Sequence, residues 1–185
     1  MWSMIARRPR AGVIAALVAV AASLLLAQNP AAAATGYGGD VKRSIVIGRA
    51  QDWYDRNVPY SQNLDESTWV WDENHGRKYR PDCSGFISMT WKLTSSRNTQ
   101  TLTDVSHTIN WNDLLPGDAL LKTTGNLATE HVRLFDKWVD ASTHADFWYY
   151  EEGSTATDMN HVRVNVRDIR NDGYHPIRYD HIVKG

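Results

Sequence analysis

The 185-residue chain contains one cysteine, Cys83, which lies in the stretch Arg80-Pro81-Asp82-Cys83-Ser84-Gly85. A lone cysteine either packs in the core or is kept for the chemistry of its thiol. Asp82 is a good N-cap residue, and helical spacing follows it, so we predict a helix over 83–93 that begins at Cys83. The first turn of a helix stabilises a thiolate through its free amides and its dipole. Cys83 is therefore a candidate nucleophile.

A thiol nucleophile needs a base that accepts its proton, and seven histidines are available. His131 is the strongest candidate, because residues 131–135 alternate as a β-strand that begins directly after a loop. Functional residues are often found at such loop ends. The sequence thus favours a Cys83–His131 pair.

A third group must hold the second nitrogen of the imidazole. Glu151 ends an aromatic strand predicted over 146–151, which we expect to pair beside the His131 strand. Its neighbour Glu152 faces the opposite side, and His144 follows His131 by 13 residues. We choose Glu151 and keep Glu152 and His144 as alternatives, because the sequence alone does not set the strand register.

The elements that would position these residues follow an α+β order with an antiparallel sheet. A helix is predicted from Val41 to about Asn57, and a polar loop that contains Trp69 and Trp71 covers residues 64–79. After the helix over 83–93 we expect only strands, at 119–122, 131–135, 146–151, 162–166 and 176–183.

Residues 1–34 have the composition of a secretory signal peptide. Three arginines precede an apolar run over 11–27, and small alanines follow at 31–34. We expect cleavage near Ala34, a secreted protein that is extracellular or associated with the cell wall, and no stable membrane association afterwards. Residues 35–40 are expected to form a flexible lead and 41–185 a single catalytic domain.

Composition excludes several classes of partner. Without the first 34 residues the chain has 17 basic and 21 acidic residues, and it contains no basic stripe, so nucleic acid is not an expected partner. A secreted protein with one cysteine has no disulfide framework, and its thiol is exposed to oxidation unless it is used or buried. The histidine spacings match no standard metal-ligand pattern, so we expect no metal and no cofactor. We expect a monomer.

Three ordered motifs resemble the NlpC/P60 superfamily of papain-like cysteine peptidases. Asp82-Cys83-Ser84-Gly85-Phe86-Ile87 is similar to its Asp-Cys-Ser-Gly motif, and Leu115-Pro116-Gly117-Asp118-Ala119-Leu120 to its Pro-Gly-Asp turn. The third motif, His131-Val132-Arg133-Leu134-Phe135, is similar to its His-Val strand. In addition, Pro59-Tyr60 stands where the family places a Pro-Tyr motif. The resemblance covers about residues 41–152.

The resemblance implies a papain-like fold and a secreted hydrolase that cleaves amide bonds in cell-wall peptides or peptidoglycan. Cys83 would be the nucleophile and His131 the base. Tyr60, Asp82 and Ser84 would bind the substrate. The usual third catalytic residue of the family is a histidine, which favours His144, whereas the related CHAP amidases use a glutamate at the end of the next strand, which favours Glu151.

The chain departs from the family at two places. The family's Trp-Gly-Gly after the tyrosine is replaced by Ser61-Gln62-Asn63, and residues 64–79 are an insertion. Both differences concern the substrate more than the reaction. We therefore expect a thiol amidohydrolase that works through an acyl-enzyme. The alternatives are a catalytically silent wall-binding or structural module with the same fold, and an acyltransferase or transglutaminase on the same pair of residues.

Overall fold

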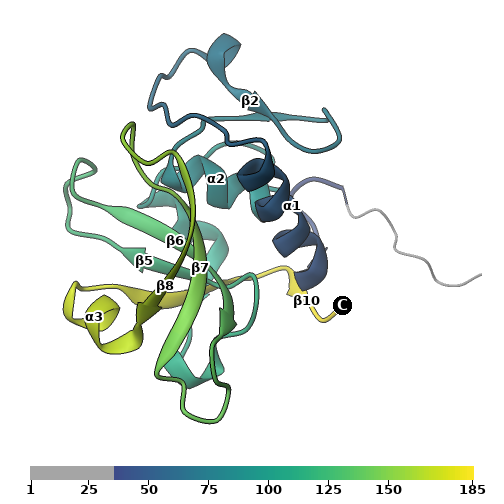
Figure 1. Ribbon diagram of the computed structural model, residues 1–185. Helices are drawn as coiled ribbons and strands as arrows, with labels where there is room; N and C mark the ends of the chain where they lie inside the picture. Colours follow the sequence, from purple (N-terminus) through teal and green to yellow (C-terminus); the bar gives the residue numbers. More distant parts are fainter. Residues whose placement is uncertain (1–35) are drawn as a thin grey trace, which may run out of the picture. The chain divides into compact units, whose positions relative to one another are not determined.

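The computed structural model describes residues 36–185, so the predicted signal peptide over 1–34 lies outside the described residues. Within residues 36–185 the fold is α+β, as predicted, with helices on both sides of an antiparallel sheet (Figure 1). The helices are α1 (Arg43–Asp55), α2 (Cys83–Thr90) and α3 (Val166–Asn171), and the 3-10 helices are Glu66–Thr68, Thr101–Val105 and Trp111–Asp113. No helix of this part of the chain is both long and apolar enough to cross a membrane.

The main sheet has six strands, and each strand is antiparallel to its neighbours. In spatial order they are β4 (Ser106–Thr108), β9 (His175–Tyr179), β5 (Ala119–Lys122), β6 (His131–Trp138), β7 (Asp146–Glu152) and β8 (Met159–Asn165).

Four of the five predicted strands have different bounds in the structure: the strand expected over 131–135 continues to Trp138, and the strand expected over 146–151 continues to Glu152. The strand expected over 162–166 runs from Met159 to Asn165, because the Asn165 side chain accepts the Arg167 N–H and starts α3 there. The segment expected as one strand over 176–183 is divided into β9 and the short β10 (Ile182–Val183). Helix α3 was not predicted, because a helix of six residues is too short to show a clear period.

The sheet separates two hydrophobic cores. On one face α1 and α2 pack against β5, β6 and β9, with Trp53, Phe86 and Val132 in the same buried cluster as Cys83. On the other face Phe147 and Ile169 belong to a second cluster, between the sheet and α3. Figure 1 shows α1 and α2 together on one side and α3 on the other. All eight residues of α2 are buried, so the start of this helix is held rigidly.

The two ends of the described chain meet in a small parallel pair. β1 (Val41–Lys42) pairs with β10, and the Val41 N–H donates to the His181 carbonyl at 2.9 Å. The segment before β1, which was expected to be a flexible lead, is held in place by its own contacts. The Gly38 N–H donates to the Lys92 carbonyl at 2.8 Å, and the hydroxyl of Tyr37 donates to Asp72.

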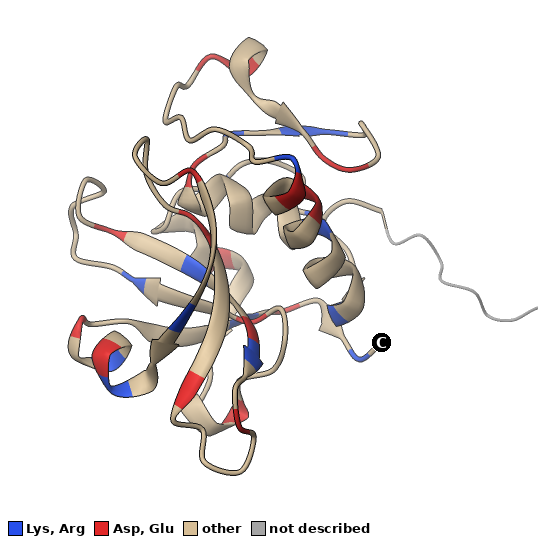
Figure 2. Ribbon diagram, in the orientation of Figure 1, with Lys and Arg blue, Asp and Glu red and all other residues tan. Residues whose placement is uncertain are grey.

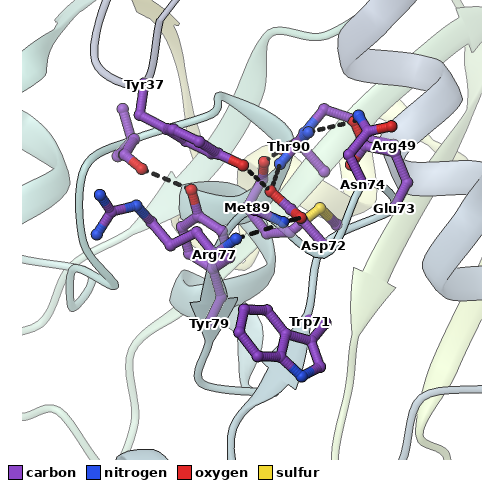
Figure 3. Close-up of polar contacts among 12 residues, drawn as sticks. Tyr37, Arg49, Trp71, Asp72, Glu73, Asn74, Arg77, Tyr79, Met89 and Thr90 are labelled. Carbon is purple, nitrogen blue, oxygen red and sulfur yellow. Dashed lines mark hydrogen bonds and ion pairs between the residues drawn. The ribbon is translucent and has the colours of Figure 1, made fainter.

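The insertion over 64–79, predicted as a polar loop, contains a hairpin of β2 (Val70–Trp71) and β3 (Lys78–Tyr79). Asp72, at the end of β2, is fully buried and accepts hydrogen bonds from the Tyr37 hydroxyl at 2.5 Å and the Gly76 N–H at 2.8 Å. The buried guanidinium of Arg49 in α1 pairs with Asp72 at 3.3 Å (Figure 3). This network fixes the insertion to α1, and the sequence did not reveal it because its members are far apart in the chain.

Replacement of Asp72 by alanine should lower the free energy of unfolding by about 3 kcal/mol, because it leaves buried Arg49 without one of its anionic partners. Asp52→Ala, which removes the partly exposed partner of Arg56, is the matched control and should cost less than about 1 kcal/mol. Urea unfolding monitored by tryptophan fluorescence measures both. Equal losses in the two variants would contradict a stabilising role for the buried network.

Candidate active site

Helix α2 begins at Cys83, as predicted, and ends at Thr90. The Asp82 carboxylate caps it, with Oδ1 accepting the Gly85 N–H at 2.7 Å and the Ser84 hydroxyl at 3.3 Å. Its other oxygen accepts the Arg80 Nε–H at 2.5 Å. Only glycine fits at position 85, because a Cβ there would lie 1.9 Å from the Arg80 carbonyl oxygen. These four residues hold Cys83 at the helix start.

The thiol of Cys83 is buried, and its pKa is raised to about 12. Burial is the main cause, and the negative charge of Asp82 adds to it. The amides of Val132 and Ser84 and the charge of Arg80 act in the opposite direction, because they favour the thiolate. Their contribution is smaller, so the thiol keeps its proton at neutral pH despite its position at a helix start.

His131 is the first residue of β6, and its Nε2 lies 2.7 Å from Glu151 Oε2 in β7. The same oxygen accepts the Arg133 Nε–H at 2.9 Å. Burial alone would raise the pKa of Glu151, but these two hydrogen bonds and the nearby positive charges hold it below its usual value. Glu151 is therefore ionised and fixes the orientation of the imidazole, whose edge meets the ring of Tyr174.

The side chains of Cys83 and His131 belong to opposite faces of the sheet. Val132 packs in the core that contains Cys83, whereas His131 contacts Tyr174, which belongs to the core on the α3 side. In the described part of the chain no hydrogen bond joins the thiol to the imidazole; the sulfur instead receives the N–H of Val132, the residue after His131. The structure thus brings together His131 with Glu151, and Cys83 with the backbone of β6.

Glu152 points to the face of the sheet opposite Glu151. It is completely buried, and neither of its carboxylate oxygens has a hydrogen-bond partner within the described residues. Burial is the main cause that raises its pKa to about 9, and the charges of Asp158 and Asp82 contribute further. Glu152 is therefore a neutral acid at pH 7 and does not contact His131.

His144 lies in the loop between β6 and β7, beyond the end of β6 farthest from His131. Its ring stacks on Trp138, with the ring centroids 4.2 Å apart. Strand β6 is eight residues long and begins at His131, so His144, beyond its other end, does not reach the imidazole of His131. Of the three candidates for the third position, the structure places only Glu151 beside His131.

The predicted substrate-binding residues lie around the thiol. The backbone N–H of Tyr60 donates to Asp158 at 2.9 Å, which fixes this segment against the turn between β7 and β8. The pKa of Tyr60 is raised to about 12 by burial and then by the negative charges that Cys83, Asp82 and Glu152 carry at high pH. Asp82 and Ser84 are engaged in internal hydrogen bonds. The immediate surroundings of the thiol are thus rich in carboxylates.

A cleft of about 460 Å³ opens beside Cys83, which is within the size range of small-molecule and peptide subsites. Sequence patterns did not predict most of its wall, because it is built from loops. Neither Trp69 nor Trp71 lines it. The lining residues are Gln62, Leu64, Arg80, Asp82, Cys83, Ser84, Asn98, Thr99, Leu127, Ala128 and Glu130.

Charged side chains of both signs are interspersed over the helices and strands (Figure 2). The histidines are dispersed as well: His161 pairs with Asp136 at 2.9 Å, and His181 with Asp40 at 3.2 Å. Within residues 36–185 no group of three histidine, cysteine or carboxylate side chains is arranged to hold a metal ion.

Comparisons with family models, with curated proteins and with solved structures found no match to this chain.

The raised pKa of the thiol predicts slow alkylation of Cys83 by iodoacetamide in the absence of substrate. Because only the thiolate reacts, the rate at pH 7 should lie well below that of N-acetylcysteine and should rise about tenfold for each pH unit beyond pH 9. Mass spectrometry of the labelled peptide gives the rates. A rate that levels off below pH 9 would show that burial and Asp82 do not control the thiol.

The buried acid Glu152 predicts a pH-dependent stability. Its pKa of about 9 in the folded protein lies above the value of about 4.3 in an unfolded chain. As the pH rises from 5 to 9 the unfolded state loses this proton first, so the free energy of unfolding should fall by up to about 1.4 kcal/mol per pH unit from this group.

Glu152→Gln removes this titration, so the free energy of unfolding of the variant, measured with urea, should depend less on pH than that of the wild type. The variant should be more stable than the wild type at pH 8 but not at pH 4. Glu66→Gln, at an exposed position, is the control and should follow the wild type. Parallel pH profiles for wild type and Glu152→Gln would refute the neutral buried acid.

Proposed function

We propose that the protein is an exported thiol amidohydrolase of the NlpC/P60 type, with a papain-like fold, that cleaves amide bonds in cell-wall peptides or peptidoglycan. The observation that carries the proposal is the position of Cys83. Cys83 lies at the start of a buried helix and lines a cleft. Its sulfur accepts the N–H of Val132, and the residue before Val132 is His131, which pairs with Glu151.

The reaction follows the chemistry of these groups. The sulfur of Cys83 attacks the carbonyl carbon of the substrate, and His131 accepts the thiol proton and delivers it to the nitrogen of the leaving amine. The resulting thioester is then hydrolysed by water, with His131 as the base. The backbone N–H of Cys83, in the first turn of α2, is a donor for the oxyanion.

The proposal requires the His131 side chain, which lies at the very start of β6, to swing from the α3 side of the sheet to the thiol when substrate binds. Glu151 occupies Nε2, so Nδ1 is the nitrogen that remains for the sulfur. Catalytic groups are often poorly aligned in the absence of substrate and become aligned only in the complex. An imidazolium next to the sulfur would also lower the pKa of the thiol and offset the effects of burial and Asp82.

A second candidate function is a catalytically silent module that binds the cell wall. Two observations favour it: the pKa of Cys83 is raised to about 12, and no hydrogen bond connects Cys83 and His131 in the described residues. Such a module would bind peptidoglycan without releasing products. Binding and product release can be measured on the same samples.

Digestion of purified peptidoglycan, followed by mass spectrometry of the soluble products, tests the proposal. Cys83→Ala and His131→Ala should abolish product release, and Glu151→Gln should lower the rate about 100-fold, because the imidazole loses its ionised partner. His144→Ala, which alters a ring remote from the pair, should keep the wild-type rate.

Release that survives Cys83→Ala would overturn the choice of nucleophile. Wild-type protein that sediments with peptidoglycan but releases no product would favour the silent module. A loss of release in His144→Ala with unchanged folding would show that Glu151 is not the third residue.

A further inference from the structure

Two exposed leucines face the cleft beside Cys83. Leu64, from the insertion, is 75% exposed, and Leu127, from the loop between β5 and β6, is 50% exposed. Leu64 is the most exposed large apolar side chain within residues 36–185. Ala128 adds a third apolar residue to the same wall. Apolar side chains of this size, left in water at the entrance of a cleft, favour contact with an apolar ligand group.

The charged groups of the cleft are already satisfied by the protein. Arg80 donates to Asp82 at 2.5 Å and to the Arg97 carbonyl at 3.2 Å. Glu130 accepts the Thr99 hydroxyl at 2.5 Å and the Gly125 N–H at 2.9 Å. A charged ligand would have to break these bonds to gain a partner. Of the charged and apolar side chains in this wall, the apolar ones are therefore those that remain free for recognition.

Both leucine-bearing loops are held in position without a ligand. Glu130 accepts four hydrogen bonds: two, from the side chains of Thr99 and Gln100, connect the Leu127 loop to that segment, and two, from the N–H groups of Thr124 and Gly125, hold the loop itself. The Leu64 loop is closed by the Trp69 Nε1–H, which donates to the Asn63 carbonyl at 2.9 Å. A wall formed in advance loses little conformational entropy when a ligand binds.

The cleft also lies on a defined side of the thiol. His131 must protonate the leaving amine, so the leaving group belongs on the side of the histidine. His131 does not line the cleft, whereas Cys83 does. The part of the substrate that enters the cleft is therefore the acyl part, which becomes bonded to sulfur.

We propose that this cleft is a subsite for a bulky aliphatic side chain on the acyl side of the scissile amide, with Leu64 and Leu127 as the residues that determine specificity. The assignment of the acyl side rests on the proposed hydrolase function. The apolar preference itself rests on the cleft alone, so the two can be tested separately.

The test uses alkylation of Cys83 in the full-length mature protein by three iodoacetamides that carry an N-isobutyl, an N-(2-carboxyethyl) or an N-(2-aminoethyl) group. In each case the thiolate displaces iodide and forms a thioether, so no base is needed after ionisation. Rates at pH 9, divided by those of N-acetylcysteine, should favour the isobutyl reagent about tenfold over both charged reagents.

Leu64→Ala and Leu127→Ala should each remove most of this preference. Leu115→Ala is the matched control, because Leu115 is 42% exposed and does not line the cleft, and it should keep the wild-type ratio. Circular dichroism checks that each variant is folded. Equal normalised rates for the three reagents in wild type would overturn the subsite, and so would a preference for the aminoethyl reagent.

The outcome separates this subsite from the proposed reaction. Selective alkylation in a protein that hydrolyses no peptidoglycan would keep the apolar subsite and remove the hydrolase. Peptidoglycan hydrolysis in a protein with unselective alkylation would keep the hydrolase and remove the subsite.

Discussion

The two-residue repeat of strands β6 and β7 decides which side chains can meet in this molecule. Val132 packs in the core under α2, so its neighbour His131 must face the other side of the sheet. Because of the same repeat in β7, Glu151 contacts His131, whereas Glu152 points to the face of the sheet on which the thiol lies. A shift of one residue in the register of β7 would place Glu152 beside His131 and turn Glu151 to the side of the thiol. The distribution of charge around Cys83 therefore follows from strand geometry.

Asp82 has two opposing effects at the site. As the cap of α2 it fixes the helix start and with it the position of the thiol. As a buried negative charge it also disfavours the thiolate. Arg80 compensates in part through its ion pair with the same carboxylate. The local stretch of sequence that places the thiol thus does not favour its thiolate alone, and a thiolate at neutral pH would require a positive charge from another element.

Features with local causes could be predicted from the sequence. The start of α2 was predicted because its cap lies next to Cys83, and the strands at 119–122 and 146–151 were predicted from their alternation and composition. Features that depend on contacts between distant parts of the chain could not be predicted from the sequence. Asp72 resembles an ordinary loop residue until Tyr37 and Arg49 surround it, and the burial of Glu152 depends on how β7 packs. Tertiary packing decides which face of the sheet His131 and Cys83 each contact, and the alternation pattern of the sequence does not determine this.

The parallel pair of β1 and β10 has a mechanical consequence. Because the two strands run in the same direction, a force that pulls the chain outward before Val41 and after Val183 acts along both strands in opposite senses. The hydrogen bonds of the pair are then loaded in shear and must break together, instead of one after another as in an unzipped hairpin. The junction of β1 and β10 would therefore resist tension that is applied through the ends of the domain.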